Sequence, residues 1–149
     1  MYHLDATFFD DWRDTCRRLI QSGVAPSEVR WIDRRCDNGQ TDLFAGETSE
    51  APLPDGVPKS LRVPAAFLAI AKTISHHRDR GRWELLYRML WRIQHDERHL
   101  MNIASDADVY QATQMEKAVR RDAHKMIAFV RFRQCIDDQC DHLVSCLRP

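Results

Sequence analysis

Residues 119–133 read VRRDAHKMIAFVRFR, a segment in which two periodicities meet. Its first part places apolar side chains at Val119, Ala123 and Met126, the spacing of one face of a helix. Its second part alternates apolar residues with arginine, which is the period of a strand. The segment therefore predicts a helix with a buried face, followed at once by a strand, and the fold must accommodate both.

Helical spacing also appears in the chain before this segment. Apolar residues recur from Phe8 to Ile20 until Gly23 ends the pattern, and Pro64 is typical of the first residue of a second helix that ends near residue 76. A third helix is predicted over residues 83–100. Ser105 and Asp108 have the spacing of a capping box, which would begin the last helix, predicted over residues 106–125.

Alternating residues predict the strands. Short strands are expected at residues 2–5 and 29–32, and a longer strand at 128–136 returns through a turn as a hairpin with residues 142–147. Residues 33–58 are rich in Asp, Gly, Pro, Ser and Thr and indicate a long surface loop. We expect a single α+β domain over residues 1–149, with three to four helices packed on a small, mainly antiparallel sheet and a C-terminal β-hairpin.

Composition narrows the class of protein. The chain is 44% apolar and 30% charged, and no apolar run approaches the ~20 residues that a membrane span requires. Five cysteines without a CxxC pair suit a reducing compartment, and the N-terminal residues lack the pattern of a signal peptide. We expect a cytoplasmic protein.

The zero net charge conceals an asymmetry. Residues 1–57 hold 6 Lys and Arg against 11 Asp and Glu, whereas residues 58–133 hold 15 against 8. A focused positive region favours anionic partners such as nucleic acid, although two solvated faces of opposite charge would give the same count.

The positive region predicts a phosphate-binding face. Its cations lie on the last helix, where Lys117 also faces outward, and on the strand that follows, with Phe129 placed to stack on a base. The predicted nucleic-acid-binding residues are Arg120, Arg121, His124, Lys125, Phe129, Arg131 and Arg133, supported by Arg88 and Arg92. Residues 125–132 also match several positions of an RNA-recognition signature, but Met126 replaces its glycine and Ile127 replaces a stacking aromatic residue.

A metal-assisted enzyme acting on nucleic acid or nucleotides is the alternative from another class. His95 and His99 lie four residues apart in a predicted helix, a spacing that metal-binding helices use, and His124 could approach them in the fold. The segment is not an HExxH motif, and a solvated helix end explains the same residues. No Gly-rich phosphate loop, nucleophile elbow or other catalytic motif is present, so no cofactor is expected.

The residues of the opening segment also carry a family resemblance. Residues 120–126, followed by residues 128–133, resemble the hallmark run of a bacterial family described as probable DNA metabolism proteins. Residues 29–31, Val63 and Pro64, and residues 90–92 through His95 and His99 resemble the same family. The resemblance implies a role in DNA metabolism or repair.

The same resemblance implies partners. Members of the family are associated with a radical-SAM protein, and many are fused to a C-terminal uracil-DNA glycosylase-type domain. Such members continue past the hairpin, whereas this sequence ends at Pro149, which resembles a truncated N-terminal domain. The resemblance therefore implies a DNA-associated module or a docking domain for the radical-SAM partner, and it implies no reaction for this chain.

Overall fold

The computed structural model describes residues 1–32, 61–129, 131–137 and 140–146, with side chains up to residue 127. These residues form a mixed α+β fold with four α-helices and two separate pairs of strands. The elements in order are β1 (Tyr2–Asp5), α1 (Phe9–Gln21), η1 (Pro26–Glu28), β2 (Val29–Ile32), α2 (Ala65–Ile74), α3 (Arg82–His95), η3 (Leu100–Asn102), α4 (Ala107–Phe129), β3 (Arg131–Asp137) and β4 (Cys140–Cys146). The loop predicted at residues 33–58 lies outside the described residues.

The N-terminal sheet is parallel, so the prediction of one mainly antiparallel sheet is wrong. β1 and β2 pair in register from Tyr2 opposite Val29 to Asp5 opposite Ile32. The 13 residues of α1 connect the two strands and carry the chain back to the edge where β1 begins. A helical crossover of this kind joins parallel strands, whereas antiparallel neighbours need only a tight turn.

The end of α1 shows how the sequence sets this connection. Gly23 has a φ angle of +72°, a left-handed conformation in which glycine has no steric penalty. The N–H of Gly23 donates to the carbonyl of Ile20, and the N–H of Val24 donates to the carbonyl of Leu19. This pair of bonds is a Schellman motif, which ends the helix and turns the chain toward β2.

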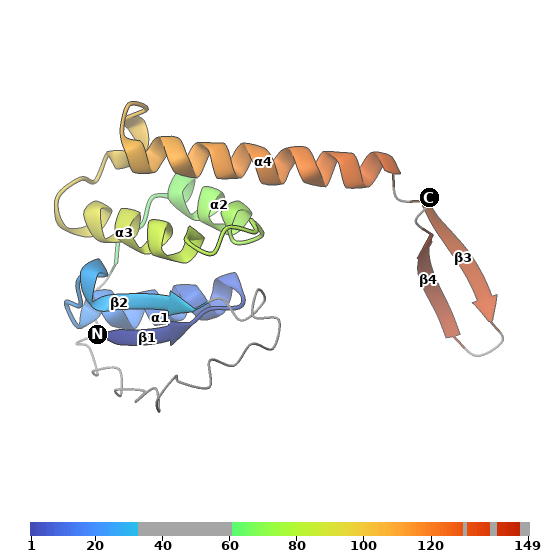
Figure 1. The fold of residues 1–149 in the computed structure, drawn as a ribbon, viewed down its shortest axis with the longest axis horizontal. Coiled ribbons are helices and arrows are strands. Elements are labelled where there is room, and N and C mark those ends of the chain that lie inside the picture. Colours follow the sequence, from blue (N-terminus) through green and yellow to red (C-terminus); the bar gives the residue numbers. More distant parts are fainter. Residues whose placement is uncertain (33–60, 130, 138–139, 147–149) are drawn as a thin grey trace.

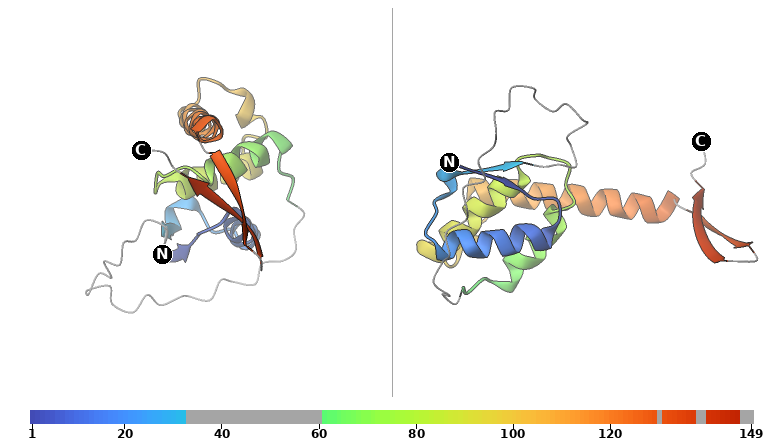
Figure 2. Two further views of the ribbon diagram at one scale, coloured as in Figure 1. Left: turned by 90° about the vertical axis from the view of Figure 1, so that its right-hand side faces the viewer. Right: turned by 90° about the horizontal axis from the view of Figure 1, so that it is seen from below.

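The helices lie in layers over the small sheet (Figure 1). α1 lies against the β1–β2 pair, α3 and α2 lie between that pair and α4, and α4 covers the opposite side. Seen from below, α4 continues beyond the other helices toward the β3–β4 pair (Figure 2). None of the helices in the described part of the chain is long and apolar enough to cross a membrane.

An aromatic cluster joins α1, β2 and α3. Trp12 stacks on Trp83 with 5.8 Å between ring centroids and lies 6.4 Å from Trp31, which meets Tyr87 edge to face at 5.9 Å. The Tyr87 hydroxyl donates to the carbonyl of Val24 at 2.7 Å, and burial raises the pKa of this phenol. The cluster fixes α3 in place, and α3 in turn supports α4.

α3 is shorter than predicted. It ends at His95, where the N–H groups of Asp96 and Glu97 both donate to the carbonyl of Arg92, and η3 then occupies part of the segment expected to be helical. The predicted core residues Trp83, Leu86, Tyr87, Leu90 and Ile93 are all buried, which confirms the predicted inward face of this helix.

α4 is longer than predicted, and its burial differs along its length. Val109, Ala112 and Met115 are buried as expected, but Ala123 is exposed and Met126 is 64% exposed. α4 continues to Phe129, so residues 128 and 129 are helical and β3 begins at Arg131. β3 and β4 pair antiparallel, with Arg131 opposite Cys146 and Asp137 opposite Cys140.

Candidate nucleic-acid interface

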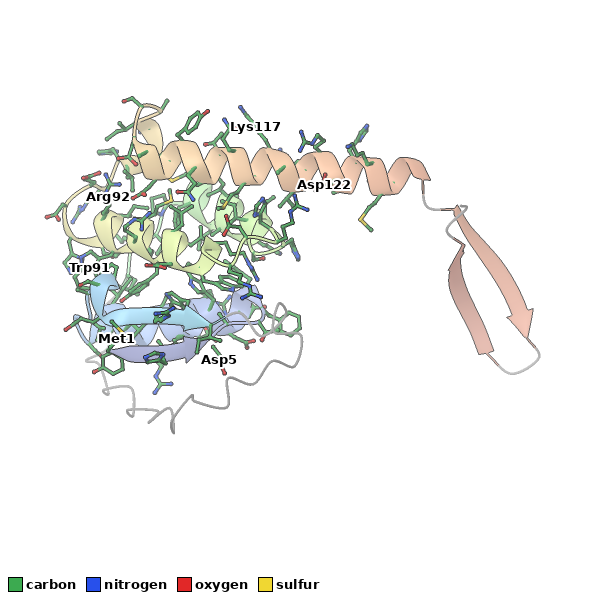
Figure 3. All side chains as sticks on the ribbon, in the orientation of Figure 1. Met1, Asp5, Trp91, Arg92, Lys117 and Asp122 are labelled. Atoms are coloured by element: carbon green, nitrogen blue, oxygen red, sulfur yellow. The ribbon has the colours of Figure 1, made fainter. Side chains whose placement is uncertain are left out.

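Arg88 and Arg92 bind carboxylates at the junction of α3 and α4. Arg92 Nη2 lies 2.7 Å from Asp106 Oδ2 and 2.7 Å from Glu97 Oε2, while Arg92 Nη1 lies 2.9 Å from Asp108 Oδ2. Arg88 Nη2 lies 2.7 Å from Asp108 Oδ1. Figure 3 shows Arg92 at this junction. We call these five residues the Arg92 cluster.

Arg88 and Arg92, predicted to support the nucleic-acid-binding face, are both paired with carboxylates in the Arg92 cluster. Two guanidinium groups face three carboxylates, so the cluster brings no net positive charge to the surface. Hydrogen bonds from Arg92 lower the pKa of Asp106 to about 2, and those from Arg88 lower the pKa of Asp108. The charged forms are therefore mutually stabilised, and the cluster serves to join two helices.

Asp106 also begins α4. Its Oδ1 accepts the backbone N–H of Asp108 at 2.9 Å and of Val109 at 3.1 Å, which satisfies two of the amides that a helix start leaves unpaired. The predicted capping box of Ser105 and Asp108 is therefore wrong, because Asp106 is the N-cap and Val109, three residues later, has no polar side chain to complete such a box. The same carboxylate is thus both a helix cap and an ion-pair partner of Arg92.

The C-terminal part of α4 carries four of the eight predicted basic residues. We call residues 120–129 the outer half of α4. Every described side chain in it, residues 120–127, is exposed. Helix-favouring residues and continuity with the packed half account for its helical form, since extending a helix costs far less than starting one. Glu116 and Arg120, at 2.7 Å, add an ion pair one turn apart.

The cations on α4 share the side that faces away from the core. Figure 3 shows Lys117 on that side, and helical geometry places Arg121, His124 and Lys125 within about 80° of it around the axis. Asp122 lies about 140° away from Lys117 and does not interrupt the row. We call Lys117, Arg121, His124 and Lys125 the outer row.

The other predicted nucleic-acid-binding residues are either already paired or have side chains outside the described part of the chain. Arg120 is on the outer half, 71% exposed, but its guanidinium binds Glu116. Phe129 is the last residue of α4 and not a strand residue, so the match to an RNA-recognition strand fails at residues 125–129, which are helical. Arg131 and Arg133 are in β3, and their side chains lie outside the described residues.

The histidines considered as an alternative metal site do not have the spacing that the sequence suggested. α3 ends at His95, so His99 lies in the following turn and not one helical turn away. His95 instead stacks on Trp91 with 3.9 Å between ring centroids. His124 lies on the outer half of α4, which is a different element. Among the residues that the structure describes, no group of three or more His, Cys, Asp or Glu could hold a metal ion.

Sequence reasoning missed one residue on the exposed side of α4. Tyr110 is 61% exposed, and helical geometry places it about 20° from Lys117 around the axis. Its spacing of seven and eleven residues from Lys117 and Arg121 is a signal that the sequence contains. This spacing does not stand out in the sequence, because a tyrosine in an amphipathic helix is usually assigned to the buried face.

Comparison with known proteins gives one match, which covers the C-terminal part of the chain. No curated protein and no solved structure matches the chain. Residues 80–149, which contain α3, α4 and the β3–β4 pair together with all of the predicted site residues, match the family model of a domain of unknown function, DUF4130.

Proposed function

We propose that the chain binds DNA through the phosphate backbone, with the outer row of α4 as the principal contact. The single observation that supports this most is the outer row itself, whose four basic side chains share one exposed side of a helix that projects beyond α2 and α3. Cations in this arrangement can each approach a phosphate without losing an existing partner, unlike Arg88 and Arg92. The resemblance to DNA metabolism proteins makes DNA the first nucleic acid to test.

Salt dependence tests the proposal directly. Each phosphate that a protein cation neutralises releases counterions, which adds about −0.7 to −0.9 to the slope of log K against log salt. Three to four contacts predict a slope of about −2 to −4, so affinity should fall about 20- to 150-fold between 50 and 200 mM NaCl. Fluorescence anisotropy with labelled single-stranded and duplex oligonucleotides measures both quantities.

A double variant identifies the surface. Arg121→Ala combined with Lys125→Ala should reduce the salt slope by about 1.4 to 1.8, because two contacts are removed. Arg17→Ala is the matched control, since Arg17 is an exposed cation on α1, at the side of the molecule away from α4. No binding by the unaltered protein at 50 mM NaCl contradicts the proposal, as does an equal effect of the control.

Protein docking is a second candidate function, favoured by the opposite side of the outer half. Ala123, Met126 and Ile127 continue the buried side of α4, yet Met126 is 64% and Ile127 is 81% exposed. The radical-SAM protein implied by the family resemblance is the partner to test. Co-purification of the two proteins should be lost when Met126 and Ile127 are both changed to Gln, and retained when Arg17 is changed to Ala.

A further inference from the structure

Tyr110 and the cations of α4 lie along one side of the helix. From Tyr110, Lys117 and Arg121 are seven and eleven residues further on, which places all three within about 40° around the axis. The rise of a helix separates Tyr110 from Lys117 by about 10 Å and from Arg121 by about 16 Å. The exposed side therefore begins with an aromatic ring and continues with positive charges.

The ring of Tyr110 has no part in the core. The first half of α4 packs through Val109, Ala112 and Met115, while Tyr110 is 61% exposed on another side of the helix. One exposed aromatic residue is ordinary on a protein surface. Its position in line with the outer row is what suggests a shared ligand, one that offers both a flat apolar face and a series of negative charges.

We propose that this side of α4 binds single-stranded nucleic acid, with the Tyr110 ring stacked on a base and with Lys117, Arg121 and Lys125 contacting phosphates. The inference rests on the proposed function and specifies its substrate class. In a duplex each base is already stacked between its neighbours, whereas a single strand has free base faces. Cationic rows with exposed aromatic rings are the usual means of binding single strands without reading their sequence.

Substitution of Tyr110 tests the inference. Tyr110→Ala should weaken binding to a labelled oligo(dT) about 5- to 150-fold, the range found when a stacking aromatic residue is removed. Binding to a duplex of the same length should change less than twofold, and the salt slope should stay the same because tyrosine is uncharged. Tyr110→Phe should bind oligo(dT) within twofold of the unaltered protein, since stacking requires the ring and not the hydroxyl.

The control is Phe8→Ala. Phe8 is 62% exposed, nearly the same as Tyr110, and precedes α1 on the opposite side of the fold. Far-UV circular dichroism establishes that both alanine variants keep the helical content of the parent protein.

The outcomes separate the two proposals. If Tyr110→Ala binds oligo(dT) as tightly as the unaltered protein, or loses duplex and oligo(dT) affinity equally, the single-strand inference is wrong while backbone binding by the outer row stands. An equal loss in Phe8→Ala would also overturn the inference. If the unaltered protein binds neither probe at 50 mM NaCl, the proposed function itself is wrong.

Discussion

Arg92 Nη2 lies 2.7 Å from Asp106 Oδ2, which joins the last turn of α3 to the N-cap residue of α4 by a charge-assisted hydrogen bond. Because Asp106 also caps α4, this contact influences both where the helix starts and how it lies on α3. The Arg92 cluster therefore determines the direction in which the outer row is presented.

Removing Arg92 should destabilise the fold. Arg92→Met leaves Asp106 and Glu97 without their strongest partner, and we expect the free energy of unfolding to fall by about 1–3 kcal/mol. For a chain of this size that corresponds to about 2–4 °C in Tm per kcal/mol. Thermal denaturation measures the change. The control is Arg98→Met, an exposed cation beyond the end of α3. It should shift Tm by less than about 2 °C, because ordinary surface substitutions change the free energy of unfolding by at most about 0.5 kcal/mol.

Acid should remove the contribution of Asp106. Its pKa is lowered from 3.8 to about 2 in the folded protein, so the ionised carboxylate stabilises the fold above pH 3.8, and this contribution is lost as the pH falls through 2. Asp106→Asn keeps a good N-cap but removes the charge. The stability difference between parent and variant should be full at pH 6 and small at pH 2 in urea titrations. Asp122→Asn, at an exposed position, is the control and should change the free energy of unfolding at pH 6 by less than about 0.5 kcal/mol.

The Tyr87 hydroxyl should contribute to stability without any role in binding. Tyr87→Phe keeps the ring in the aromatic cluster but leaves the buried carbonyl of Val24 without this donor. We expect a loss of about 1 kcal/mol in the free energy of unfolding and unchanged affinity for oligonucleotides. A variant as stable as the parent protein would show that another donor, such as water, replaces the hydroxyl.

The two methionines of α4 should respond differently to the same substitution. Met115 is 6% exposed and Met126 is 64% exposed. Met115→Ala should cost about 2–5 kcal/mol, the range for truncating a buried methionine. Met126→Ala should change stability by less than about 0.5 kcal/mol. Equal costs, measured by urea denaturation, would mean that the outer half of α4 is packed in solution.

The periodicity of the sequence identifies the four helices, and the alternation at residues 2–5 and 29–32 identifies β1 and β2. It does not reveal the direction of pairing, because strand alternation is the same in parallel and antiparallel sheets. The periodicity also cannot show at which residue of α4 the packing against the other helices ends. The apolar spacing reaches Met126, but α4 has 23 residues, about 34 Å, whereas α2 has 10 and α3 has 14.

Sequence spacing likewise predicts one part of the candidate site and not the other. Arg121, His124 and Lys125 are exposed on one side of α4 as their spacing predicts. Arg88 and Arg92 also form a row in the sequence, but their carboxylate partners follow the turn after α3, 14 to 20 residues further along the chain for Asp106 and Asp108. Local spacing identifies a row of cations, and only the tertiary fold shows which of them are already neutralised.

The exposure of residues 120–127 has a consequence for how this protein can change over time. Substitutions there remove few contacts with the core. They therefore change the free energy of unfolding little, and the protein stays as stable as its function requires. A helix anchored at one end in this way can acquire a different charge pattern, and hence a different ligand preference, without compensating mutations elsewhere. Sequence variation among homologous chains should accordingly be tolerated more readily on the outer half of α4 than at the Arg92 cluster.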